Sequence, residues 1–203
     1  MMNFSEYSRN ITGHLKISQR SSSGEEKVLF DDSNVIVSGM SVGLSYLFTA
    51  SGSDTITDYQ LSRFQVGVSG NDTAGSAIFQ LSGPLSSFSE YGGTAGPLRL
   101  VSSIQIKNGS TTTSEAFALI PHSHVTRINE TSVRYTIVLD KDSCNNITRA
   151  GPGTAGALNE IGLFMRNPRG MIPDQTILVA YRKFSDIIKT SDFALVFRWT
   201  INW

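Results

Sequence analysis

The last eleven residues of the chain constrain its fold more than any other part of the sequence. In residues 193–203 (FALVFRWTINW), every second position from Leu195 to Trp203 carries a large apolar side chain, and most positions between them are polar. Successive side chains of a β-strand point to opposite faces. Alternation over this length therefore predicts an antiparallel strand with one buried face and one face toward water.

The same alternation recurs upstream, where clusters of glycine, serine, asparagine and aspartate separate the apolar segments. Residues 132–139 (SVRYTIVL) alternate like the carboxyl-terminal segment. Seven further segments are predicted strands: residues 14–18, 27–30, 64–68, 98–107, 116–120, 160–165 and 176–184. Many short strands joined by turn residues are typical of all-β domains. We therefore expect a single domain over residues 1–203, an antiparallel β-sandwich of jelly-roll-like form.

One segment departs from this rhythm and predicts a short helix near residues 38–50. Met40, Leu44, Leu47 and Phe48 recur at helical spacing. Gly43 lies among them and weakens the helix by about 1 kcal/mol relative to alanine. We expect this helix to pack on the sheet and to cover one end of the core.

The stretch from about residue 67 to residue 96 is long, rich in serine and glycine, and weakly patterned. Long connections of this kind inside a compact domain are usually functional or ordered by a partner. We expect a projecting loop or a hairpin arm here.

The charge balance narrows the classes of partner. Seventeen basic side chains oppose seventeen acidic ones, so the formal net charge is zero. A nucleic-acid binder needs a basic surplus to neutralise phosphates, and near-zero net charge favours association. No apolar run approaches the length of a membrane span, and the first residues (MMNFSEYSRN) lack a targeting pattern. We expect cytosolic synthesis, no nucleic-acid partner, no membrane, and assembly with other copies.

His122 and His124 form the one histidine pair that suggests a metal site. On a strand, residues two apart share a face, so both rings would reach one ion. His14 is the only other histidine, and further ligands would come from distant segments or from a symmetric trimer. Two polar residues at a loop edge are the favoured interpretation.

The segment LDKDSCNN (residues 139–146) places Asp140, Asp142, Asn145 and Asn146 close together. Oxygen ligands at alternate positions suggest calcium, but the glycine and glutamate of the EF-hand loop are missing. A polar turn is the better interpretation, and the lone Cys144 is expected to be a free thiol. We therefore expect no catalytic residue, no cofactor-binding residue and no metal ligand.

The carboxyl-terminal quarter carries a resemblance. LNEIGLFM (residues 158–165) is followed by TILVAYRKFSDIIKT (176–190) and SDFALVFRWTINW (191–203). This layout resembles that of virion structural proteins of tailed bacteriophages. Further upstream, GHLKIS, the segment KVLFDDSNVIVSGMSVGLSYLF and FQVGVSGNDT resemble the opening of the same proteins.

The resemblance implies a non-enzymatic structural protein, located in the virion and needing no cofactor. Its implied partners are other virion proteins and copies of itself, with tail, baseplate or fibre attachment as the leading position. Head decoration of the capsid is the nearest alternative. In the matching segments, Gly162 permits close backbone approach, residues 190–192 can satisfy a turn before the last strand, and Ile187 and Ile188 anchor the connection.

Two other functions compete with this one. A receptor-binding or carbohydrate-binding module needs exposed aromatic side chains for stacking on a host surface glycan, and the candidates are Tyr46, Tyr59, Phe88 and Tyr91. A hydrolase of surface polymers needs paired carboxylates. Asp58, Glu90 and Glu115 are the candidates, and nothing in the sequence brings them together.

Overall fold

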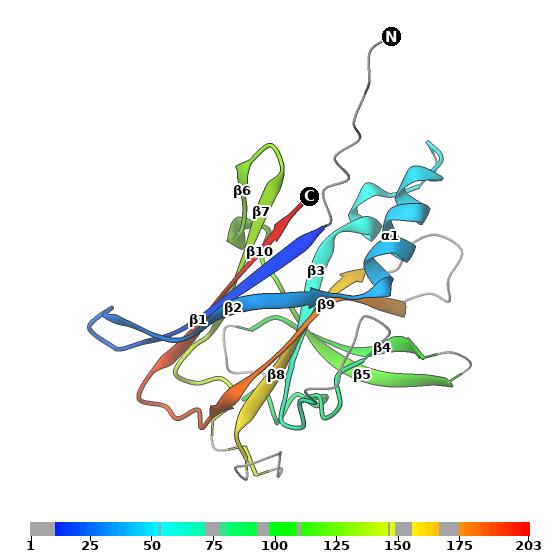
Figure 1. Ribbon diagram of the computed structural model, residues 1–203. Helices are drawn as coiled ribbons and strands as arrows, with labels where there is room; N and C mark the ends of the chain where they lie inside the picture. Colours follow the sequence, from blue (N-terminus) through cyan, green and yellow to red (C-terminus); the bar gives the residue numbers. More distant parts are fainter. Residues whose placement is uncertain are drawn as a thin grey trace.

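The computed structural model describes residues 11–52, 54–71, 78, 80–92, 98–108, 111–145, 147–148, 156–166 and 175–203. Ten strands form one sheet in the order β4-β5-β3-β8-β9-β2-β1-β10-β7-β6 (Figure 1). The strands are β1 (Thr12–Arg20), β2 (Glu26–Ile36), β3 (Leu61–Gly67), β4 (Leu100–Asn108), β5 (Thr111–Leu119), β6 (Val125–Asn129), β7 (Ser132–Leu139), β8 (Leu158–Arg166), β9 (Gln175–Ile187) and β10 (Ala194–Asn202).

The sheet is antiparallel between all neighbours in this order, which confirms the all-β class. One additional pairing is parallel and joins β4 to β9 through Ile106 and Thr176. The strands β4, β5, β3, β8 and β9 therefore form a ring of pairings at one end of the sheet.

β2 connects two halves of this curled sheet. Residues 26–34 of β2 pair with β1, whereas Val35 and Ile36 pair with Tyr181 and Ala180 of β9. We call β6, β7, β10, β1 and residues 26–34 of β2 the first half. The second half comprises residues 35–36 of β2 with β9, β8, β3, β5 and β4.

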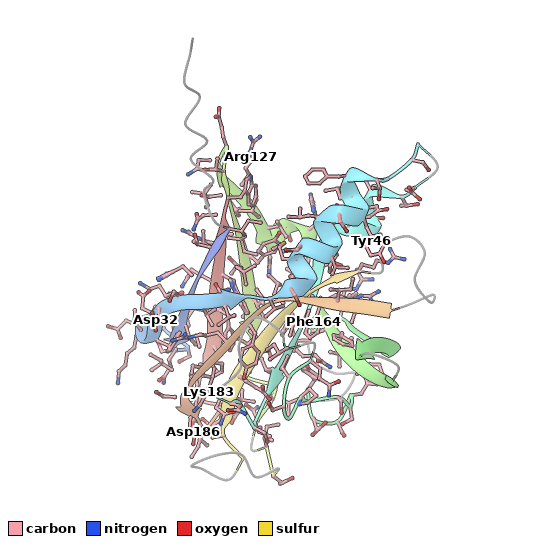
Figure 2. The ribbon with its side chains drawn as sticks, turned by 45° about the vertical axis from the view of Figure 1, so that its right-hand side comes forward. Asp32, Tyr46, Arg127, Phe164, Lys183 and Asp186 are labelled. Carbon is pink, nitrogen blue, oxygen red and sulfur yellow. The ribbon has the colours of Figure 1, made fainter. Side chains whose placement is uncertain are left out.

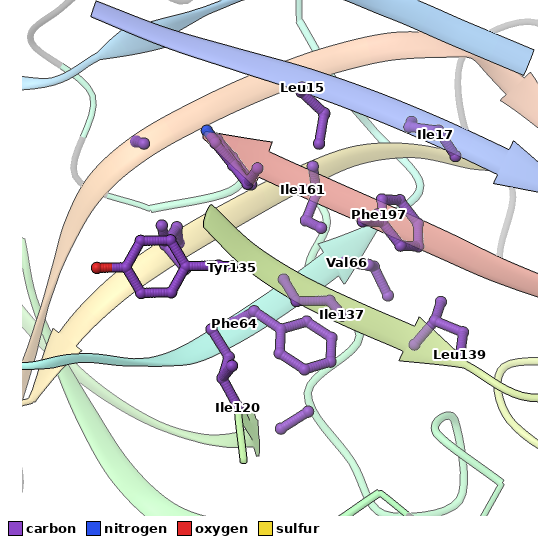
Figure 3. Packing of buried hydrophobic residues seen from close by; sticks show 14 of the residues in the cluster. Leu15, Ile17, Phe64, Val66, Ile120, Tyr135, Ile137, Leu139, Ile161 and Phe197 are labelled. Atoms are coloured by element: carbon purple, nitrogen blue, oxygen red, sulfur yellow. The ribbon is translucent and has the colours of Figure 1, made fainter. Parts of the chain in front are cut away.

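The two halves face each other across one hydrophobic core (Figure 3). Alternate residues of the first half meet alternate residues of the second half there, and the principal members are Leu15, Ile17, Ile137, Leu139, Phe197 and Trp199 with Phe64, Val66, Ile161, Leu163 and Val179. The Trp199 indole is fully buried and donates from Nε1 to Oδ1 of Asn34 at 2.8 Å. The predicted inward face of the last strand is confirmed up to Ile201, whereas Trp203 is half exposed.

A second, smaller core lies on the opposite face of the second half. It is built from Val37, Leu81, Phe117, Phe164, Leu178 and Tyr181. The rings of Phe117 and Phe164 meet edge to face with centroids 5.0 Å apart. Because both faces of β8 are covered, every residue from Leu158 to Met165 is buried. The prediction of one core between two layers is therefore incomplete.

The predicted helix is confirmed as α1 (Ser38–Phe48), which packs against β9 (Figure 1). Met40 contributes to the first core. Gly39 and Gly43 are buried, and a Cβ atom on Gly43 would lie 2.5 Å from Sδ of Met165. Gly43, which lowers the helix propensity, is therefore a position at which a side chain of the sheet approaches the helix closely, and at Gly39 the Leu178 carbonyl oxygen approaches still more closely.

Two strand predictions needed correction. β6 was missed, because its five residues are mostly exposed and include no run of large apolar side chains. β2 is longer than the predicted segment 27–30, since it continues through the polar residues Asp31, Asp32, Ser33 and Asn34. Pairing with β1 holds these polar residues in the strand.

The described part of the 67–96 stretch folds back on the second half and does not project. Val68, Leu81, Leu85 and Tyr91 are buried. The Val68 amide donates to the Gly83 carbonyl at 3.0 Å, and the Leu85 amide donates to the Val66 carbonyl at 2.8 Å. Residues 72–77, 79 and 93–97 lie outside the described part of the chain.

Candidate functional site

The two neighbouring histidines lie in a 3-10 turn and not on a strand. The turn η3 (His122–His124) follows Pro121, whose carbonyl accepts a hydrogen bond from the His124 amide at 2.9 Å. His14 lies in β1, where its Nε2 is 2.9 Å from Oδ1 of Asp31. Among the described residues, no group of three or more His, Cys, Asp or Glu side chains could hold a metal ion. The loop-edge interpretation agrees with the position of η3 between β5 and β6.

The acidic segment after β7 is a turn closed by its own side chains. Asp140 Oδ1 accepts hydrogen bonds from the Asp142 amide at 3.1 Å and from Ser143 Oγ at 2.7 Å. Asn145 Oδ1 accepts from Lys189 Nζ at 2.8 Å. These contacts confirm the polar-turn interpretation, and the Asn146 candidate lies outside the described residues.

Cys144 is buried in this turn, with a φ of 56° in the left-handed region. Burial raises the pKa of its thiol to about 12. A thiol is a nucleophile only as the thiolate, so Cys144 is inert at neutral pH.

Two of the four candidate glycan-stacking aromatics are in the core. Tyr59 and Tyr91 are buried, whereas Tyr46 and Phe88 are half buried. Tyr46 lies on α1 (Figure 2) and Phe88 on the stretch before β4. The structure therefore offers no shared stacking platform from this set of four.

The one describable carboxylate of the hydrolase candidates supports a turn. Glu90 Oε2 accepts from the amides of Ser86 and Ser87 at 3.0 and 3.2 Å, and from Ser87 Oγ at 3.0 Å. The side chains of Asp58 and Glu115 lie outside the described part of the structure.

A buried carboxylate that the sequence analysis placed in the phage-like segment is a structural clamp. Glu160, on β8, is fully buried. Its Oε1 accepts from the Gly83 amide at 2.7 Å, and its Oε2 accepts from the Ser82 amide at 3.0 Å and from the Tyr181 hydroxyl at 3.2 Å. Glu160 therefore fixes the returning chain at Ser82 and Gly83 to the sheet.

The neighbour of Glu160 completes the clamp. Asn159 Oδ1 accepts from the Gly70 amide at 2.8 Å, and its Nδ2 donates to Asp186 Oδ1 at 2.9 Å. Asp186 lies towards the end of β9, near Lys183 (Figure 2). Burial raises the pKa of Glu160, while the two backbone amides and the Tyr181 hydroxyl oppose that rise. Hydrogen bonds of this kind offset the cost of burying a charge.

Lys189, which follows β9, is a second charged side chain of the phage-like segments that stabilises the fold. Lys189 is buried and its Nζ donates to the carbonyl of Thr190 and to Oδ1 of Asn145, both at 2.8 Å. Thr190 Oγ1 donates to Asp192 Oδ2 at 2.9 Å, as expected for a turn. Ile188 is exposed, so its predicted anchoring role is wrong.

The short 3-10 helix η1 (Ile56–Tyr59) lies beside α1 (Figure 1). Three apolar side chains of these two elements are exposed to solvent. Phe48 is 83% exposed, Ile56 is 65% exposed and Val42 is 41% exposed. Asp54 closes the turn between the two elements by accepting from the Ser51 amide at 2.6 Å. We call the exposed side chains of Val42, Phe48 and Ile56 the α1–η1 surface.

Helical spacing predicts that Phe48 lies on the inward face of the helix, and this prediction is wrong because Phe48 is exposed. The sequence signal that indicates this surface is the absence of charged residues. Residues 33–53 contain no charged side chain, although much of this stretch is exposed. Exposed segments without charge are unusual on a dispersed protein, because charged side chains normally keep such surfaces apart.

Comparisons with family models, curated proteins and solved structures each found no match to this chain. Among the helices that the structure describes, none is long and apolar enough to cross a membrane.

Proposed function

We propose that this chain is a non-enzymatic structural subunit of a tailed bacteriophage particle, located in the virion and assembled through protein–protein contacts. The tail, baseplate or fibre region is the first position to examine. In this proposal, the two halves facing each other across the first core act as the jelly-roll-like sandwich expected from the sequence.

The observation that carries the proposal is the α1–η1 surface. Val42, Phe48 and Ile56 expose large apolar side chains to water on two neighbouring elements. Val42 and Phe48 lie in the stretch 33–53 without charge, and Asp54, which precedes Ile56, is engaged in the turn between the elements. Exposed apolar side chains gathered in one region are typical of an interaction site, and the complement of a mainly apolar surface is another apolar surface.

A second copy of this chain is the occupant that fits best. The chain carries such an apolar surface itself, and its formal net charge is zero. Two copies therefore approach without net electrostatic repulsion. Repetition of one contact among identical subunits produces the closed symmetry of most assemblies.

The phage-like segments support the proposal in a different way. Their distinctive residues hold the fold together: Glu160 clamps the returning chain, Gly162 lets Leu81 and Leu178 approach, and Lys189 closes the turn before β10. The resemblance therefore concerns scaffold residues, as a shared architectural part would require. The candidate chemical groups Asp140 and Glu90 are likewise engaged in turns.

Electron cryomicroscopy of the particle produced by the phage that encodes this chain tests the proposal. We expect density into which the fold fits in repeated, symmetry-related copies, with the α1–η1 surface covered by a neighbouring copy. Particles that contain no copy of this chain by mass spectrometry would overturn the proposal.

A further inference from the structure

Among the described residues, one edge of β7 has no partner strand over half of its length. β10 pairs with β7 along the whole strand, from Ser132 to Leu139. β6 covers only residues 132–135 on the other side. Within the part of the chain that the structure describes, residues 136–139 therefore have a free edge, and no further hydrogen bond involves them.

The sequence of this free edge lacks the usual protection. Natural edge strands carry lysine, proline or a bulge that blocks pairing with another chain. The free edge reads Thr136, Ile137, Val138 and Leu139, of which the first three are β-branched and none is charged. β-branched residues favour extended pairing. In contrast, the covering strand β6 contains Arg127 and is mostly exposed.

A hollow of about 400 Å³ lies directly beside this edge. It is the open seam between the two halves, where β7 of the first half faces the ends of β3 and β5 of the second half. Its apolar lining is formed by Phe64, Leu98, Leu119, Ile120, Pro121, Ile137 and Val138. Free backbone groups and an apolar hollow therefore occur at one place, which is the arrangement that accepts an added strand.

The rim of the hollow carries two arginine side chains. Arg20, Arg99 and His124 line it together with a single acid, Asp140. Asp140 is already engaged with the Ser143 hydroxyl. Among the described residues, neither Arg20 nor Arg99 forms an ion pair within 4.0 Å, although Arg20 lies opposite Glu26 across β1 and β2 and its charge helps to lower the pKa of Glu26. The complementary ligand is therefore acidic as well as apolar.

We propose that this seam is an acceptor site for an extended segment of another polypeptide, in which acidic side chains alternate with apolar ones. The segment pairs with residues 136–139 of β7, places an apolar side chain in the hollow, and directs carboxylates to Arg20 and Arg99. This site is separate from the α1–η1 surface. Its existence does not depend on the self-association proposed above.

The test uses the full chain and short acetylated peptides with a fluorescent label. The first peptide alternates glutamate and valine around a central phenylalanine. The second replaces each glutamate with lysine, and the third replaces one central valine with proline, which cannot donate to the ladder. We expect saturable binding of the first peptide in fluorescence anisotropy, with slowed amide exchange at residues 136–139. The other two peptides should bind at least about tenfold more weakly.

Charge reversal on the protein provides the matched control. Arg20→Glu together with Arg99→Glu should weaken the first peptide by about tenfold and should reverse the preference towards the lysine peptide. Arg127→Glu changes the same charge on exposed β6, outside the hollow, and should leave binding within about twofold. Circular dichroism confirms that each variant is folded.

Several results would overturn the proposal. They are equal affinity for the glutamate and lysine peptides, undiminished binding of the proline peptide, protection away from residues 136–139, or no binding up to about 1 mM peptide. None of these results bears on self-association, which the light-scattering measurement below tests separately.

Discussion

The two halves of the curled sheet use the same kind of strand in different ways. The first half buries one face against the first core, and its other face is exposed over much of its area, apart from Ser18 and Val196. On this outer face Arg198 forms a bidentate pair with Glu26 at 2.7 Å. In the same half, Lys16 Nζ lies 3.1 Å from Asp31 Oδ2. The second half is covered on both faces, because the smaller core lies behind β8. Only the first half is therefore a strand layer of the simple amphipathic kind.

This difference in burial explains why the pKa values of carboxylates shift in opposite directions in the two halves. Glu26 is partly exposed, and its pKa is lowered, chiefly by the hydrogen bond with Arg198. Glu160 is fully buried, and its pKa is raised by that burial. The first half uses carboxylates as solvated surface partners, whereas the second half uses one carboxylate to hold backbone amides in the interior.

The largest expected contrast between the halves concerns outward-facing side chains on their central strands. Phe164→Ala removes the ring that packs on Phe117 in the smaller core and should lower the free energy of unfolding by about 3–5 kcal/mol. Thr200→Ala on β10 should change it by at most about 0.5 kcal/mol. Urea denaturation measures both. Equal effects at the two positions would show that the second half has only one buried face.

The glycine at the centre of the phage-like segment gives the next largest effect. A Cβ on Gly162 would lie 2.5 Å from Leu81 Cδ1 and 2.8 Å from Leu178 Cδ1, so Gly162→Ala should cost about 1–3 kcal/mol through overpacking. Gly52 has nothing within 4 Å of the same position. Gly52→Ala is therefore the matched control and should be neutral by thermal denaturation. A tolerated Gly162→Ala would remove the packing explanation for this residue.

The clamp is tested by Glu160→Gln. The amide retains one acceptor oxygen but places a donor against a backbone amide, so we expect a loss of about 1–3 kcal/mol. Amide exchange at residues 81–85 should accelerate more than exchange in β10. Uniform acceleration across both halves would mean that Glu160 contributes only to global stability and does not hold the returning chain.

The dependence on pH should have opposite signs in the two halves. The folded pKa of Glu160 lies above its unfolded value near 4.5, so its ionisation costs stability as pH rises through the folded pKa. The difference in unfolding free energy between wild type and Glu160→Gln should therefore increase as pH falls from neutral towards 4.5. Glu26 has a lowered pKa, so its contribution is present above pH 4.5 and is lost as pH falls. Glu26→Gln should cost at most about 1 kcal/mol at pH 7. The same sign for both residues would contradict this account.

The sequence predicted the buried faces of β7 and β10 in the first half, but it did not predict what covers the second half, for a physical reason. Alternation in residues 132–139 and 193–203 identifies strands with one wet face, and helical spacing identified α1. Alternation carries no information about what covers the other face of β8, where Gly162 and Glu160 interrupt the apolar run. It also did not show that β2 passes from one half to the other, because its polar residues at positions 31–34 resemble a turn.

The candidate sites were less predictable still. Cys144, Tyr91 and Glu90 have side chains that can take part in catalysis or binding. In the fold, Cys144 and Tyr91 are buried, and Glu90 accepts a hydrogen bond from a backbone amide. The α1–η1 surface was missed because Phe48 fits a helical apolar face, and only tertiary packing shows that α1 turns it outward. The open seam exists because β6 pairs with only part of β7. The number of residues that pair between two strands cannot be predicted from the residue pattern of either strand.

The most direct test of the central claim, association through the α1–η1 surface, is the mass of the full chain in solution. Light scattering coupled to size exclusion should give multiples of 22.1 kDa for the wild type, with the fraction rising with concentration. The double variant Phe48→Ser with Ile56→Ser should remain at 22.1 kDa, while Val28→Ser, at an exposed position on β2, should associate as the wild type does. A wild-type chain that stays at 22.1 kDa at every concentration, or a double variant that associates as well as the wild type, would contradict the account.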